Sequence, residues 1–142
     1  MVATILFWLN KQNNKQNKGF HGKAIRIQQR LISRFADEID LQHQLVVSFL
    51  MAGQPQSALA VLELVLQRWP RSGFAQVHYG FILKTTANDL ERAVGYLRAG
   101  IDTREQGVID GRFYYQLGDA LNRLGRHDEA QQVSALLAFC VS

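Results

Sequence analysis

The sequence predicts an all-α fold, an α-solenoid of about three helix-turn-helix repeats with one unpaired helix on the N-terminal side. Small residues recur at Ala24, Ala58, Ala93 and Ala130, with spacings of 34, 35 and 37 residues. Each alanine follows a polar or turn-like stretch and begins an amphipathic run. A recurring alanine marks the point where two paired helices cross, because only a small side chain lets their backbones approach closely.

Turn residues and caps place seven helices along the chain. Pro55 suits the first turn of a helix, where its missing N–H is not needed, and Pro70 ends the same helix. Ser72 and Asp110 are expected to act as N-caps. The helices are predicted at 22–36, 39–52, 55–69, 73–86, 89–101, 112–124 and 127–139.

The second repeat carries two irregularities. It has one extra residue around Asn88, and Asn88 with Glu91 three residues later is typical of a capping box that begins a helix. The connection at 102–110 contains Gly107 and several charged residues. We expect it to form a protruding loop that lengthens the repeat.

The residues around the alanines resemble the tetratricopeptide pattern, in which helix A carries a large apolar residue, then Leu-Gly, then another apolar residue. The third unit fits best, with Tyr114, Leu117, Gly118, Leu121, Gly125, Ala130 and Leu137. In the first unit Val46 stands where glycine is usual. The partner of the helix that contains Ala24 would have to come from residues 1–20, which do not look helical. The residues expected to pack paired helices together are Ala24, Ala58, Gly80, Ala93, Gly118 and Ala130.

We expect residues 1–20 to be a disordered leader and residues 21–142 to form one repeat domain. The apolar run at 2–9 is much shorter than the roughly 20 residues that a membrane-spanning helix needs, so no transmembrane segment is predicted. A signal peptide also fits poorly, because no basic region precedes the run and no small-residue cleavage site follows it. A degraded targeting segment is the alternative to a disordered leader.

Positive charge is concentrated near the N-terminus. Residues 1–36 hold seven of the sixteen Lys and Arg residues and none of the twelve acidic ones. Arg26, Arg30 and Arg34 fall on one helix face, which could contact phosphate or anionic lipid or could simply be a solvated face. No nucleic-acid partner is predicted, because no aromatic residues interleave with these cations to stack bases and no recognition-helix motif accompanies them.

No catalytic residue, metal ligand or cofactor-binding residue is predicted, and no cofactor is expected. The histidines are scattered singly, so none forms a helical metal-binding pair, and His78 is interpreted as a packed or hydrogen-bonded side chain. Cys140 is the single cysteine and therefore cannot form an internal disulfide. Asp128 and Glu129 are expected to offset the dipole at the start of the last helix.

Two segments carry a more specific resemblance. They are Gly73-Phe-Ala-Gln-Val-His-Tyr-Gly-Phe-Ile-Leu-Lys84 and Asp110-Gly-Arg-Phe-Tyr-Tyr-Gln-Leu-Gly-Asp-Ala-Leu121. Both resemble the repeat region of the aspartyl/asparaginyl β-hydroxylases. In that family, as the resemblance implies, the repeats lie in the lumen of the endoplasmic reticulum behind a membrane anchor. They precede an oxygenase domain that uses Fe(II) and 2-oxoglutarate to hydroxylate Asp or Asn in EGF-like domains.

The resemblance is strong from about 71 to 130, and the family's pattern then continues into the oxygenase domain whereas this chain ends at Ser142. We therefore expect a truncated, non-catalytic fragment that keeps the repeats. A free-standing adaptor that binds a peptide segment of a partner protein is the alternative. A third interpretation is a membrane-surface protein that uses the basic first helix.

A ligand groove is expected along the first helix of each repeat. Apolar residues should lie at its centre and charged residues toward one end. The expected lining residues are His43, Val47, Phe74, Val77, Phe81, Lys84, Arg112, Tyr115, Asp119, Asn122 and Arg123. Packing of these aromatic side chains against neighbouring helices is the competing interpretation.

The apolar surface of the last helix indicates that the chain associates with itself. Its apolar residues have no later helix to cover them, and one preceding repeat cannot bury them all. These residues are Val133, Leu136, Leu137, Phe139 and Val141.

Overall fold

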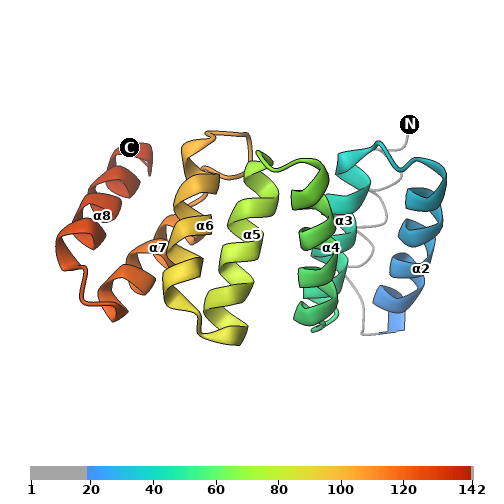
Figure 1. The fold of residues 1–142 in the computed structure, drawn as a ribbon, viewed down its shortest axis with the longest axis horizontal. Coiled ribbons are helices and arrows are strands. Elements are labelled where there is room, and N and C mark those ends of the chain that lie inside the picture. Colours follow the sequence, from blue (N-terminus) through green and yellow to red (C-terminus); the bar gives the residue numbers. More distant parts are fainter. Residues whose placement is uncertain (1–18, 142) are drawn as a thin grey trace. The chain divides into compact units, whose positions relative to one another are not determined.

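The computed structural model describes residues 19–141, which form seven α-helices and one short π-helical turn (Figure 1). The helices are α2 (Gly19–Arg34), α3 (Ile39–Met51), α4 (Pro55–Arg68), α5 (Gly73–Ile82), α6 (Leu90–Asp102), α7 (Gly111–Arg123) and α8 (His127–Val141), and the π-helical turn is η1 (Leu83–Ala87). No strand occurs between residues 19 and 141, so the predicted all-α class is confirmed. The predicted leader lies almost entirely outside these residues, as do the side chains of Cys140 and Val141.

The predicted helices agree with the observed ones to within a few residues at most ends. The exception is the segment predicted as one helix at 73–86. Its α-helical hydrogen bonding stops at Ile82, and the chain continues through η1, which ends at Asn88 in the left-handed conformation with φ 54°. A π turn accommodates an additional residue within a helix, so the extra residue of the second repeat is absorbed here.

Of the three N-cap residues predicted from the sequence, two are correct. Ser72 accepts a hydrogen bond from the Ala75 amide at 3.2 Å, and Asp110 accepts one from the Arg112 amide at 2.8 Å. The predicted capping box at Asn88 is wrong, because Asp89 is the N-cap of α6 and accepts from the Arg92 amide. Asparagine tolerates a positive φ, so Asn88 ends the π turn instead of beginning the next helix.

The chain forms two compact units, Met1–Val65 and Leu66–Ser142, with the division inside α4. In the first unit α2 packs against α3. Both contribute apolar side chains that recur at helical spacing, and α4 adds three more before the division. The buried apolar residues of this unit are Ala24, Ile25, Leu41, Leu45, Val46, Phe49, Ala58, Leu62 and Val65.

In the second unit successive helices pack against one another in chain order, α5 on α6, α6 on α7 and α7 on α8. Figure 1 shows α5 and α6 side by side, joined at the end where η1 lies. Their buried side chains form one continuous core, which includes Val77, Val94, Leu97, Ile101, Val108, Phe113, Tyr114, Leu117, Leu121, Ala130 and Val133.

The closest helix approach in this unit is between α5 and α6, and glycine makes it possible on both sides. A Cβ added to Gly80 would lie 2.9 Å from the Leu97 amide nitrogen and 3.0 Å from the Ala93 carbonyl oxygen. A Cβ added to Gly100 would lie 2.8 Å from the Val77 amide nitrogen. Gly80 and Ala93 were assigned to packing from the sequence, whereas Gly100 was not.

The α7–α8 crossing leaves more room between the two helices. A Cβ added to Gly118 would lie 3.9 Å from Val133, which is ordinary van der Waals contact. Ala130 is nevertheless buried in this crossing, as are Ala24, Ala58 and Ala93 in their own helices. The recurring alanines therefore all lie in the core, and of the α5–α6 and α7–α8 crossings only the first requires glycine.

The connection between α6 and α7 does not simply protrude. Val108 is 1% exposed and belongs to the core of the second unit. The Glu105 carboxylate accepts hydrogen bonds from the amides of Gly73 at 3.0 Å and Phe74 at 3.4 Å. These amides have no partner within α5, and a negative charge is favourable at this end of a helix. The predicted loop is therefore fixed at two points, through buried Val108 and through Glu105, which caps the N-terminal end of α5.

We expect Gly100→Ala to destabilise the protein by about 1–3 kcal/mol, because the added methyl group must push α5 away from α6. Gly95 in the same helix provides the control, since a Cβ there would meet no atom within 4 Å. Gly95→Ala should instead stabilise the protein by roughly 0.5–1 kcal/mol, because alanine loses less entropy in a helix. Urea denaturation of both variants measures the difference, and similar effects of the two substitutions would contradict the assigned crossing.

Candidate functional site

Most residues of the expected groove lie on two helices of the second unit, and we call this surface the α5–α7 face. The helix spacing places Phe74 and Phe81 on one side of α5 and brings the contributing residues of α7 to one side of that helix. α5 and α7 are in contact. The face consists of Phe74, Phe81, Lys84, Arg112, Tyr115, Asp119, Asn122 and Arg123.

Lys84 connects the two halves of this face. Its ammonium group lies 2.6 Å from an Asp119 carboxylate oxygen and also donates to the Gln116 side-chain carbonyl. The Lys84 side chain is 7% exposed, whereas that of Asp119 is 38% exposed. Because a buried ammonium needs both a counter-ion and hydrogen-bond acceptors, Lys84 acts as an internal crosslink between η1 and α7. Asp119 keeps part of its carboxylate accessible to a ligand.

The aromatic ring of Phe74 is held in place by contacts with neighbouring side chains. Phe74 is half-buried and stacks on His78, with 3.9 Å between ring centroids. The His78 ring also meets the edge of Phe113 and is hydrogen-bonded through Nδ1 to the Phe74 carbonyl oxygen at 2.8 Å. The interpretation of His78 as a packed histidine is therefore correct. Tyr115 is different, because 65% of it is exposed.

Both arginines of the face are oriented by neighbouring side chains. The Arg112 guanidinium contacts the Asp110 carboxylate at 2.8 Å, and hydrogen bonds from Arg112 hold the pKa of Asp110 below its usual value. Arg123 donates to the Asn88 side-chain oxygen at 2.6 Å. Asn122 lies beside Arg123 in the chain, and its side-chain oxygen contacts His127 Nδ1 at 3.1 Å. The two guanidinium groups are thus exposed but partly ordered before any ligand binds.

Val77 does not line this face. It is fully buried and packs against Gly100, because its place on α5 points toward α6. The spacing rule that selected it assumes a standard repeat and does not take into account how closely these two helices approach. His43 and Val47 belong to the first unit, where both are half-buried and His43 Nδ1 lies 3.9 Å from Asp40.

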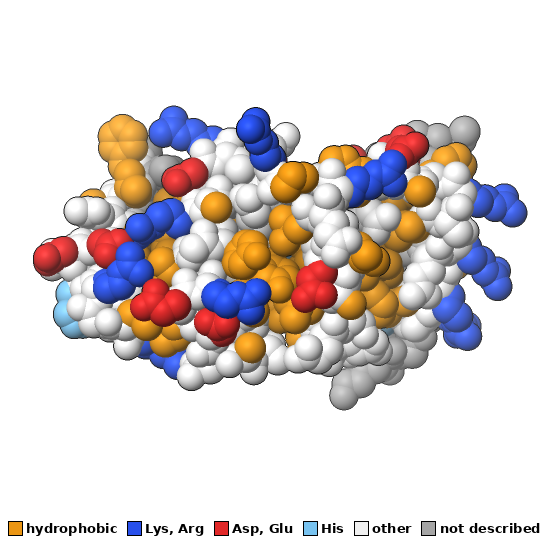
Figure 2. Space-filling model, viewed as in Figure 1, with side chains coloured by type: hydrophobic (Ala, Val, Ile, Leu, Met, Phe, Trp, Pro, Cys, Tyr) orange, Lys and Arg blue, Asp and Glu red, His pale blue; other side chains and the backbone are white. Residues whose placement is uncertain are grey.

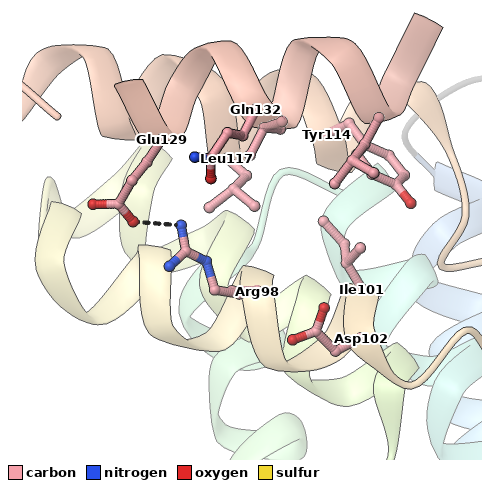
Figure 3. A pocket seen from close by; sticks show the side chains of 9 residues that line it. Arg98, Ile101, Asp102, Tyr114, Leu117, Glu129 and Gln132 are labelled. Carbon is pink, nitrogen blue, oxygen red and sulfur yellow. Dashed lines mark hydrogen bonds and ion pairs between the residues drawn. The ribbon is translucent and has the colours of Figure 1, made fainter. Parts of the chain in front are cut away.

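A small cavity between α6, α7 and α8 was not expected from the sequence. Its volume is about 150 Å³. Apolar side chains such as Ile101 and Leu117 form its base, while Arg98 and Asp102 of α6 face Glu129 and Gln132 of α8 across it (Figure 3).

Glu129 makes two ion pairs at the edge of this cavity. Its carboxylate contacts Arg126 at 2.7 Å and Arg98 at 2.8 Å, and hydrogen bonds from Arg126 and then Arg98 lower the pKa of Glu129 to about 2. Its position in the first turn of α8, beside Asp128, agrees with the expected dipole interaction. The link to Arg98 in the previous repeat could not be found from local sequence. Acidic and basic side chains alternate over this part of the surface (Figure 2).

Within residues 19–141, no three His, Cys, Asp or Glu side chains lie close enough together to hold a metal ion. Over the same part of the chain, no helix is both long and apolar enough to cross a membrane.

Two known proteins are similar to this chain in sequence. The aspartyl/asparaginyl beta-hydroxylase of Mus musculus is 44% identical over 100 residues, which are 70% of this chain and 13% of the mouse protein. The aspartyl/asparaginyl beta-hydroxylase of Homo sapiens is 38% identical over 118 residues, which are 83% of this chain and 15% of the human protein. The chain therefore spans only a small part of the length of either relative.

Solved structures of MamA share the fold. MamA 41-end from Desulfovibrio magneticus RS-1 has a TM-score of 0.67 at 17% identity, over 86% of this chain and 67% of that one. The MamA RS-1 ArsTM double mutant has a TM-score of 0.70 at 21% identity, over 93% and 74%. This likeness shows the fold alone, an α-solenoid of tetratricopeptide-like repeats. No protein-family model matches the chain.

We expect the two residues of the Lys84–Asp119 ion pair to differ in how much stability the protein loses when each is replaced. Asp119→Ala should cost roughly 1–3 kcal/mol of stability, because it leaves the buried Lys84 charge without its counter-ion. Lys84→Met should cost less, since it removes the charge and keeps most of the volume. In the double variant most of the Asp119→Ala loss should disappear. Urea denaturation of the four proteins tests this, and strictly additive losses would show that the two side chains are not coupled.

Proposed function

Because this chain corresponds to the tetratricopeptide-repeat region of the aspartyl/asparaginyl beta-hydroxylase family, we propose that it is a non-catalytic module that binds a protein partner. The chain supplies a binding surface, and the α5–α7 face is that surface.

The observation that carries this proposal is the solvent exposure of the Tyr115 side chain. It is 65% exposed on a helix whose other large apolar side chains are buried, namely Phe113, Tyr114, Leu117 and Leu121. Tyrosine and arginine supply much of the binding energy at protein interfaces, because they combine a large contact area with hydrogen-bonding groups. Along α7, Tyr115 comes after Arg112 and before Arg123, on the same side of the helix as both.

The partner proposed for this face is an EGF-like domain that presents an Asp or Asn residue, the substrate class implied by the resemblance. The accessible charges of the face suit such a ligand. Arg112 and Arg123 are exposed, whereas the Lys84 charge is compensated internally by Asp119. A carboxylate or a side-chain amide oxygen can accept from a guanidinium edge that its own neighbours leave open.

The alternative is a free-standing adaptor that takes an extended peptide segment instead of a folded domain. The half-buried rings of Phe74 and Phe81 favour it, because they offer shallow apolar contacts along α5 at a spacing of two helical turns.

Tyr115→Ala should weaken binding of an EGF-like domain about tenfold or more, as expected for an exposed aromatic anchor. Leu64 on α4 provides a matched control, since it is also 65% exposed but lies outside the α5–α7 face, and Leu64→Ala should leave affinity unchanged. Isothermal titration calorimetry with the full chain measures both. Binding that is equally strong in the two variants would remove this face from the proposal. Binding of extended peptides but of no EGF-like domain would favour the adaptor.

The outer side of α8 supports a second proposal, that two copies of this chain associate. Leu136 is 55% exposed and Phe139 is 82% exposed, and the two are nearly one helical turn apart. Val133 is buried, and Leu137 packs partly against the core of the second unit. Only part of the apolar face predicted from the sequence is therefore exposed at the surface, where a second copy could contact it.

Leu136→Ser with Phe139→Ser should shift the chain toward monomer, because these substitutions remove exposed apolar area and touch little of the core. Leu137→Ser is not suitable, since it would also destabilise the fold. Sedimentation equilibrium at two concentrations provides the measurement. A wild-type chain that stays monomeric at the higher concentration without precipitating would contradict self-association through α8.

A further inference from the structure

Helix α2 presents a continuous basic stripe. Lys23, Arg26, Arg30 and Arg34 are all exposed, and at 100° per residue they fall within about a quarter of the helix circumference. The sequence of α2 contains no acidic residue. None of these four side chains has an ion-pair partner among the residues that the structure describes. Figure 2 shows Lys and Arg side chains projecting from the edge of the first unit where α2 lies.

An apolar stripe borders the basic one. Ile27 is 42% exposed, Leu31 is half-buried, and Phe35, directly after the helix, is 46% exposed. These three residues are spaced by four and lie next to the arginines on the helix circumference. A shallow depression of about 430 Å³ lies at this border, lined by Ile27, Arg30, Leu31, Ser33 and Arg34.

The core of the first unit does not need either stripe. The inward face of α2 is made by other residues, since Ala24, Ile25 and Gln28 are 4%, 7% and 1% exposed. We therefore expect substitutions at the exposed positions of the two stripes to leave these buried contacts in place. The nearest acidic residues along the chain, Asp37 and Glu38, follow the end of the helix and do not interrupt the cations.

We propose that α2 binds the surface of an anionic membrane. A helix with cations on one stripe and exposed apolar side chains beside it lies parallel to a bilayer, with its arginines among the lipid phosphates and its apolar residues at the level of the first acyl carbons. Ile27, Leu31 and Phe35 supply the apolar contact, and the depression beside Arg30 and Arg34 receives a headgroup phosphate. This surface shares no residue with the α5–α7 face, so this proposal does not depend on the proposed partner.

A membrane is favoured over a nucleic acid by the apolar border. Binding to single-stranded nucleic acid depends on several aromatic side chains that stack bases between cations, and within residues 21–36 Phe35 is the only Phe, Tyr or Trp. Exposed Ile27 would contribute nothing to phosphate binding, whereas it adds affinity at a lipid interface.

Flotation of the full chain with phosphatidylcholine vesicles, with and without about 30 mol% phosphatidylserine, tests the proposal. The chain should bind the anionic vesicles, bind the neutral ones far less, and be released at about 0.5 M salt. Arg26→Gln with Arg30→Gln should weaken binding about 25-fold, taking roughly fivefold for each cation near an anionic surface. Arg71→Gln with Arg92→Gln changes the net charge equally at exposed positions elsewhere and should weaken binding by less than about threefold.

Ile27→Ser with Phe35→Ser separates a lipid interface from a general polyanion site. It should weaken binding to the anionic vesicles and leave binding to a single-stranded RNA homopolymer unchanged. Circular dichroism verifies that each variant keeps its helical content. Equal binding to neutral and anionic vesicles, equal losses in the two arginine pairs, or no effect of the apolar pair would each overturn the proposal.

Discussion

The close approach of α5 and α6 is the constraint on which the second unit depends. Two glycines on facing helices, Gly80 and Gly100, let the backbones approach to a distance that no Cβ would permit. This approach buries Val77 and Leu97 completely and sets the positions from which the side chains of α5 reach α7. Because the interior is close-packed, a small displacement at this crossing would be transmitted to the α5–α7 face.

Polar interactions between successive repeats add specificity to this packing. Lys84 reaches Gln116 and Asp119, Arg98 reaches Glu129, and Glu105 caps the amide end of α5. Several of these contacts join residues separated by 31 or 32 positions, nearly one repeat. Such contacts act between neighbours only, which is the way a repeat protein distributes its stability. The π turn η1 contributes directly, since it carries Lys84.

Two of the surfaces proposed to bind other molecules, the α5–α7 face and α2, differ in chemistry. On the α5–α7 face, most charged groups already have a hydrogen-bonding or ionic neighbour, and an exposed tyrosine stands among them. Such an ordered arrangement favours a partner of defined shape, because less side-chain freedom is lost on binding. On α2 the cations have no ionic neighbour among the described residues, and a fluid anionic surface does not require them to be ordered.

The sequence by itself determined the helical class, most helix bounds to within a few residues, the burial of the four recurring alanines and the packed state of His78. Those features follow from local periodicity, caps and small residues at fixed intervals, which act within one repeat. Tertiary structure decided which side chains meet: the burial of Val77 and Lys84, the need for Gly100, the capping of α5 by Glu105 and the pairing of Arg98 with Glu129. These depend on the distance and rotation between helices, which close packing of whole surfaces sets and which no short window of sequence contains.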